Sequence, residues 1–209
     1  MMHGFQNWIQ ISILCGLAVL GFGRAIILKA QKTRVFVLDA QMTKTQFFNG
    51  VFFSICFLAW IFESFSYGLS LNYHIPLAVL DKLIIRHSVL KLSGMIVLIF
   101  GLAIYAMALY SFRDSWRIGI DRDKPGELIT TGVFRYSRNP IYVSLDLLIL
   151  GTFLLQGRLV FLILFVCLAV SLHIQILQEE DFLIQTYGDA FLSYCSKTGR
   201  YINMTLFLR

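Results

Sequence analysis

Two polar clusters in the second half of the sequence contain the residue types that could carry chemistry. The first cluster runs from Leu128 to Tyr142, and in it Arg135 and Arg138 precede Pro140. Because proline favours the first turn of a helix, these arginines stand just before a helix N-terminus, where free amides and the helix dipole favour an anion. The cluster therefore predicts a carboxylate-binding corner. Alternatively, the arginines only anchor the chain at a membrane boundary.

The second cluster is acidic and follows a long apolar run. It contains Glu179, Glu180 and Asp181, and an aromatic segment from Tyr187 to Tyr194 comes after it. Three adjacent acids at a helix C-terminus oppose the helix dipole, at a cost of about 0.3–1 kcal/mol for each charge. A cationic ligand or the arginines of the first cluster could compensate them. A solvated helix end is the alternative, and it is the better interpretation for Asp181.

The composition predicts that membrane helices position both clusters. The chain has 209 residues, of which 57% are hydrophobic and 14% are charged, whereas soluble proteins are about 45–50% apolar. Its mean hydropathy is +0.72. Since a span needs about 20 apolar residues, we expect transmembrane helices at 8–28, 47–71 and 88–110. A fourth apolar block, 141–177, is too long for one helix and is interrupted by Gln156-Gly157-Arg158, which predicts a helical hairpin.

The expected fold is therefore an all-α integral membrane protein with five transmembrane helices, the last two forming a C-terminal hairpin. We divide it into a three-helix membrane region, 1–110, and a part that carries the two clusters, 111–209. The side expected to hold both clusters has thirteen Lys and Arg residues, against four on the other side. Because basic loops stay in the cytoplasm, we expect the N-terminus outside and both clusters in the cytoplasm.

Several function classes and locations are disfavoured. The four cysteines form no CxxC or Cys/His cluster, so we expect neither a disulfide framework nor a metal site. The net charge of +6 comes from bases that flank apolar segments, so we expect no nucleic-acid partner. The first residues lack the basic start of a cleavable signal peptide. The lack of eukaryotic retrieval or lipidation signals favours a bacterial inner membrane.

Taken together, the two clusters form an ordered pattern around the hairpin. The pattern reads Leu128-x-Thr130-x-Gly132-x-Phe134-Arg135-x-x-Arg138-Asn139-Pro140-x-Tyr142, then Glu179-Glu180-x-x-Leu183-x-x-x-Tyr187-Gly188-x-x-Phe191-x-x-Tyr194. It resembles the isoprenylcysteine carboxyl methyltransferase family and its relatives among membrane phospholipid and thiol methyltransferases. The resemblance covers about the last hundred residues. It implies an S-adenosylmethionine-dependent methyltransferase whose cofactor sits in a cytosol-facing pocket between the loop, the hairpin and the tail.

The chemistry of S-adenosylmethionine suits these residue types. Arginines and helix-start amides suit its carboxylate, acids suit its ammonium or ribose, and aromatic faces suit its sulfonium and adenine. The resemblance implies cofactor contacts at Leu128, Thr130, Gly132, Arg135, Arg138, Asn139, Pro140, Tyr142, Glu179 and Glu180.

Methyl transfer requires chiefly the alignment of donor and acceptor, so no covalent nucleophile is expected. Arg113, Arg117 or Arg200 could orient a carboxylate or thiolate acceptor. An amine acceptor must lose a proton, for which Glu179 and Glu180 are candidates. We expect the acceptor to be lipophilic or delivered by the lipid bilayer, because the pocket must open at the membrane boundary.

One residue departs from the family pattern, because the usual Arg-His-Pro appears here as Arg138-Asn139-Pro140. Asparagine can donate a hydrogen bond but cannot become cationic, and His173 is a spare candidate for a charged role. Glu63 and Asp146 lie inside apolar spans, where each either faces the site or makes an interhelical hydrogen bond.

Two other functions remain open from the sequence. Sterol reductases resemble this family over the same hairpin, so an NADPH-dependent membrane reductase is one alternative. A non-enzymatic membrane adaptor or small transporter is the other.

Overall fold

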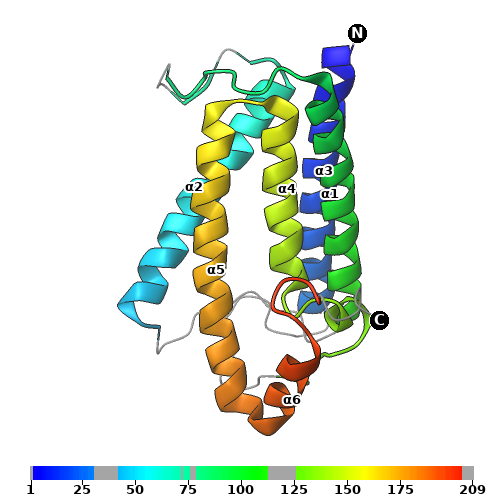
Figure 1. Ribbon diagram of the computed structural model, residues 1–209, viewed down its shortest axis with the longest axis vertical. Helices are drawn as coiled ribbons and strands as arrows, with labels where there is room; N and C mark the ends of the chain where they lie inside the picture. The colour runs from blue at the N-terminus through cyan, green and yellow to red at the C-terminus, as the bar shows by residue number, and fades with distance from the viewer. Residues whose placement is uncertain (1, 31–41, 72, 76–78, 113–125, 204–209) are drawn as a thin grey trace.

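The computed structural model describes residues 2–30, 42–71, 73–75, 79–112 and 126–203, which fold into a bundle of helices (Figure 1). The helices are α1 (Met2–Ala30), α2 (Lys44–Gly68), α3 (Ser88–Phe112), η2 (Gly132–Arg135), α4 (Pro140–Gln156), α5 (Leu159–Tyr187) and α6 (Asp189–Lys197). η2 is a short 3-10 helix. In the described part, strand pairing is limited to one bridge between Leu83 and Arg158, so the prediction of an all-helical protein is confirmed.

In the described parts of the chain, four helices are long and apolar enough to cross a membrane, which supports an integral membrane protein. They are Gln6–Ala30 within α1, then α2, α3 and α5. α4 is apolar but has only 17 residues. At 1.5 Å per residue it reaches about 25 Å, less than the about 30 Å of a bilayer core. Four of the five predicted spans therefore meet the length requirement, and α4 is the short arm of the hairpin.

The hairpin forms where the proline and the glycine of the sequence predict it. Pro140 occupies the start of α4, where its missing N–H costs no helical hydrogen bond. Gly157 ends α4 in the left-handed conformation, with a φ of 67°, which glycine adopts without steric cost. α5 begins two residues later, at Leu159. The two arms of the hairpin are therefore fixed by one proline and one glycine.

α5 is longer than the sequence analysis predicts. It continues to Tyr187, because no glycine or proline interrupts it before Gly188. Glu179, Glu180 and Asp181 therefore lie about two turns before the end of the helix. The dipole effect fades beyond the last turn, so the expectation that these acids oppose it at a C-terminus is wrong.

α3 and α4 pack closely through glycine. A Cβ atom on Gly94 would lie 2.6 Å from the backbone nitrogen of Leu155. One on Gly151 would lie 3.0 Å from the carbonyl oxygen of Gly94. Small residues at such positions let two membrane helices approach until their backbones touch. This contact fixes the position of α4, whose first turn belongs to the first polar cluster.

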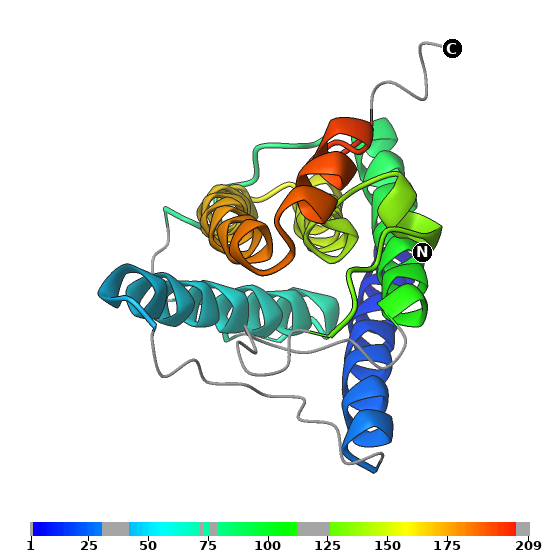
Figure 2. The same cartoon turned by 90° about the horizontal axis from the view of Figure 1, so that it is seen from below.

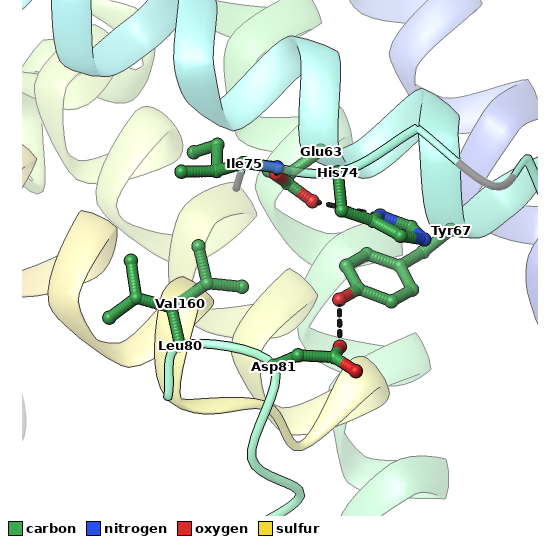
Figure 3. A pocket seen from close by; sticks show the side chains of 7 residues that line it. All are labelled: Glu63, Tyr67, His74, Ile75, Leu80, Asp81 and Val160. Carbon is green, nitrogen blue, oxygen red and sulfur yellow. Dashed lines mark hydrogen bonds and ion pairs between the residues drawn. The ribbon is translucent and has the colours of Figure 1, made fainter. Parts of the chain in front are cut away.

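The connection between α2 and α3 is bound to the turn of the hairpin. The amides of Ile84 and Ile85 donate to the carbonyl of Gly157, at 2.7 and 3.0 Å. The Arg158 guanidinium donates to the Asp81 carbonyl at 2.9 Å and lies over the Tyr67 ring, 4.5 Å from its centroid. Figure 3 shows that Tyr67 points toward Asp81, to which its hydroxyl donates a hydrogen bond.

Glu63 anchors the same connection from inside α2. Its side chain is buried, with 1% exposure. One carboxylate oxygen lies 3.2 Å from His74 Nδ1, and the other accepts a hydrogen bond from the amide of Ile75 (Figure 3). A cavity of about 10 Å³ beside these groups has room for about one water molecule. Glu63 thus has a hydrogen-bonding role, but its partners lie in the connection after α2 and not on another helix, as the interhelical alternative required.

Replacing Glu63 with glutamine should lower the free energy of unfolding by about 1 kcal/mol. The amide oxygen of glutamine can still accept from Ile75, but the charge that faces His74 is lost. Thermal unfolding in detergent measures the change. The same substitution at exposed Glu127 is the control, and equal stability of the two variants would contradict the anchoring role.

The two ends of the bundle carry different features. The N-terminus and the turn of the hairpin lie at one end, whereas η2, α6 and the segment after α6 gather at the other (Figure 1). Seen from this second end, α6 lies beside the lower parts of α4 and α5, and α1 and α2 point away from them (Figure 2). Both polar clusters therefore lie at one end of the molecule.

Candidate functional site

The two polar clusters meet in a direct ion pair between α4 and α5. Arg138 stands just before α4, and its guanidinium donates to both oxygens of Glu180 on α5. The bond from Nε to Oε1 is 3.1 Å, and the bond from Nη2 to Oε2 is 3.2 Å. The Glu180 side chain is buried, with 5% exposure for the residue. Residues 42 positions apart in the sequence thus form one fork-shaped contact of the kind that arginine makes with carboxylates.

Two more donors complete the environment of Glu180. The side-chain amide of Asn139 donates to Oε1 at 3.0 Å, and Arg200 Nε donates to Oε2 at 2.9 Å. Hydrogen bonding to the carboxylate raises the pKa of Arg200, against the opposing effect of its own desolvation. A buried carboxylate is tolerated when its charge and lone pairs are matched in this way. Arg138, Asn139 and Arg200 therefore hold Glu180 in its charged form.

The same side chains bind the C-terminal segment to the start of α4. Arg138 Nη1 donates to the carbonyls of Thr198 and Cys195, at 2.8 and 3.3 Å. The backbone amide of Arg138 donates to the carbonyl of Gly199 at 3.0 Å. Asn139 donates to the carbonyl of Arg200 at 3.2 Å. Arg138 and Asn139 thus connect three parts of the chain: the start of α4, the buried side of α5 and the segment after α6.

A second polar pair involves the first turn of α4. The hydroxyl of Tyr142 donates a hydrogen bond to Glu179 Oε1. Glu179 therefore has a neutral partner, whereas Glu180 has two arginines. The first turn of α4 has no side-chain cap, because the Asn139 side chain is engaged elsewhere. Uncapped amides at a helix start are ready donors for an anion.

The remaining residues predicted for the site have different surroundings. Thr130 and Arg135 are exposed, and Leu128 is half-buried. Gly132 has a φ of 63°, and a Cβ atom there would lie 2.6 Å from Ser111 Oγ, so packing against α3 already requires a glycine. Arg113 and Arg117 lie outside the described residues. Of the predicted set, the structure therefore brings together Arg138, Asn139, Pro140, Tyr142, Glu179, Glu180 and Arg200.

Other contacts of the site were not assigned from the sequence. Tyr194 on α6 donates to the carbonyl of Phe134 at 2.5 Å, and its burial raises its pKa. Tyr187 donates to the carbonyl of Gly126 at 3.0 Å. These two tyrosines hold the loop before α4 against α5 and α6. The tyrosines are visible in the motif, but their acceptors are backbone carbonyls, which no side-chain pattern reveals.

Comparison with known proteins shows what this part of the chain is similar to. Residues 89–190, which run from α3 to the start of α6, match the family model described as phospholipid methyltransferase. This part of the chain is therefore similar to the phospholipid methyltransferases. The resemblance inferred from the two motifs is thereby confirmed.

A related protein matches part of the same chain. The "Protein-S-isoprenylcysteine O-methyltransferase" of Schizosaccharomyces pombe is 35% identical over 77 residues, which cover 36% of this chain and 33% of the relative. The match thus spans about a third of the length of this curated relative.

Proposed function

We propose that the protein is an S-adenosylmethionine-dependent methyltransferase that acts on a lipophilic or membrane-delivered acceptor. The proposal is supported chiefly by one observation: the two family motifs meet through the contact of Arg138 and Asn139 with Glu180. We further propose that this end of the bundle faces the cytoplasm of a bacterial inner membrane. In this arrangement, residues 111–209 carry the cofactor site, and residues 1–110 hold it at the membrane.

The donor set around the start of α4 fits the cofactor. The uncapped amides of Ile141 and Tyr142 suit a carboxylate, and Glu179, whose hydrogen-bond partner Tyr142 is neutral, suits an ammonium group. The ring of Tyr142 offers an aromatic face for a sulfonium. S-adenosylmethionine, when bound, supplies a methyl group that is already activated for transfer. The residues of the chain must then align the acceptor and exclude water.

Glu180 has a different role in this proposal. Its oxygens already accept hydrogen bonds from Arg138, Asn139 and Arg200, so they are less available to a ligand than those of Glu179. We therefore assign these four residues to positioning. They fix the start of α4 and the C-terminal segment on either side of the cofactor. The remaining residues of the first motif, from Leu128 to Arg135, are proposed to close the pocket beside them.

Replacing Glu179 with glutamine should weaken S-adenosylmethionine binding at least tenfold, because the substitution removes the charge opposite the cofactor ammonium. Isothermal titration in detergent measures the affinity. Asp181→Asn is the matched control, since Asp181 is exposed on the same helix. Its affinity should equal that of the wild-type protein.

Two results would contradict the proposal. One is the absence of S-adenosylmethionine binding to folded wild-type protein. The other is protection from thermal unfolding by NADPH and not by S-adenosylmethionine, which would indicate a reductase.

A further inference from the structure

Asp146 is a half-buried acid that the proposed site does not yet use. It lies on α4 four residues after Tyr142, so both side chains share one face of the helix, one turn apart. Its Oδ1 atom is buried and has no hydrogen-bond partner among the described residues. An acid at this depth costs about 2.5–3.5 kcal/mol on insertion scales unless something compensates it. The interhelical hydrogen bond that the sequence left open is thus not made by this atom.

The charge of this carboxylate acts on Tyr201, which is one of a pair of hydrogen-bonded aromatic residues. His173 of α5 and Tyr201 of the C-terminal segment are joined between Nδ1 and the hydroxyl oxygen at 2.5 Å. Their rings are nearly parallel, with an interplanar angle of 18° and centroids 6.1 Å apart. Burial raises the pKa of Tyr201, and the negative charge of Asp146 raises it further. The carboxylate is therefore within electrostatic reach of the phenol.

Among the described residues, the two arginines at this end of α4 bind another carboxylate. Arg200 precedes Tyr201 in the chain, but its guanidinium binds Glu180 through Nε and Nη2, at 2.9 and 2.8 Å. Arg138 binds the same carboxylate. Asp146 therefore keeps one acceptor atom, Oδ1, without a hydrogen-bond partner among the described residues. A carboxylate attracts a cation and repels an anion.

We infer that Asp146 binds the ammonium group of an amine acceptor and determines the specificity of the acceptor site. The inference rests on the proposed function, because it assigns an acceptor to that same site. Its position, one turn from Tyr142 toward the membrane interior, suits an acceptor whose apolar part lies among the helices. A carboxylate acceptor would meet like charge at Asp146.

In this inference, Asp146 also removes a proton from the ammonium group of the acceptor. A protonated amine has no free lone pair, so it must lose a proton before it can be methylated. In this step the N–H bond breaks, an O–H bond forms on Asp146 Oδ1, and the electron pair stays on nitrogen. The ammonium becomes a neutral amine and the carboxylate becomes a neutral acid. The proton returns to water after the product leaves.

Binding of three small probes tests the inference without turnover. Hexylamine, hexanol and hexanoate have equal chain length and differ in the charge of the head group. Each is titrated into the full protein in lipid nanodiscs, and the heat from protein-free nanodiscs is subtracted. Wild-type protein should bind hexylamine at least tenfold more tightly than either other probe. Asp146→Asn should remove this preference, and Asp181→Asn should keep it.

The affinity for S-adenosylmethionine, measured on the same samples, separates this inference from the proposed function. Asp146→Asn should leave it within twofold of the wild-type value. A tenfold loss would mean that Asp146 serves the cofactor ammonium, which overturns the inference and leaves the proposed function standing. Tighter binding of hexanol or hexanoate to wild-type protein would also overturn it, and this comparison stands even if the variant does not fold. Wild-type protein that prefers hexylamine but does not bind S-adenosylmethionine would instead contradict the proposed function.

Discussion

Replacing Glu180 with alanine should lower the free energy of unfolding by about 3–5 kcal/mol, because it leaves buried charge without a partner. Arg138 and Arg200 both donate to this carboxylate, at 3.1 and 2.9 Å, and Asn139 donates to it at 3.0 Å. The alanine variant should also bind S-adenosylmethionine at least tenfold more weakly, since the start of α4 and the C-terminal segment lose their common anchor. Thermal unfolding and isothermal titration measure the two effects.

The neighbouring acid provides the control for this variant. Asp181 is exposed, so Asp181→Ala should change stability by no more than about 0.5 kcal/mol. Glu180→Gln should fall between the two, because its side-chain oxygen can still accept from one arginine. If Glu180→Ala is as stable as Asp181→Ala, the ion pair does not hold the site together.

Position 139 gives the second large effect, with opposite results for two substitutions. Asn139→Leu removes the donor to Glu180 Oε1 and to the Arg200 carbonyl, and it should cost about 1–3 kcal/mol of stability. It should also weaken S-adenosylmethionine binding at least tenfold. Asn139→His keeps a ring N–H that can donate to Glu180, so its affinity should stay within about threefold of the wild-type value or improve.

Parallel titrations and unfolding curves of the two variants measure this difference. A histidine variant that binds more weakly than the leucine variant would show that hydrogen bonding at position 139 is not what the site requires. A leucine variant with wild-type affinity would show the same. The departure from the usual Arg-His-Pro would then need another explanation.

Much of the fold could be predicted because membrane helices and their ends leave local signals. Pro140 and Gly157 mark the start and the end of α4 through their own backbone preferences, so a local sequence signal is enough to predict both ends. The apolar block 141–177 predicts an end of α5 that is ten residues too early, because hydropathy alone does not show that polar residues continue the helix. Glu179 and Glu180 are polar, but each faces a partner on another segment, so the helix continues through them to Tyr187.

The sequence predicts which residues meet at the site, but it does not predict their hydrogen-bond partners. The motifs placed Arg138 and Glu180 together, and the structure joins them directly. The sequence left open whether a cationic ligand or the arginines of the first cluster compensate the acids, because two residues that suit a ligand equally suit one another. Gly132 illustrates the same limit, since its packing on Ser111 accounts for a glycine that a ligand could also require.

Photolabelling with radioactive S-adenosylmethionine tests the location of the cofactor most directly. Wild-type protein in nanodiscs is irradiated with the labelled compound, with and without excess unlabelled competitor, and then digested and mapped. The account predicts competable label on the peptide that contains Pro140 to Tyr142 or on the one that contains Glu179. Competable label confined to the opposite end of the bundle, around Glu63 and His74, or folded protein that takes up none, would contradict it.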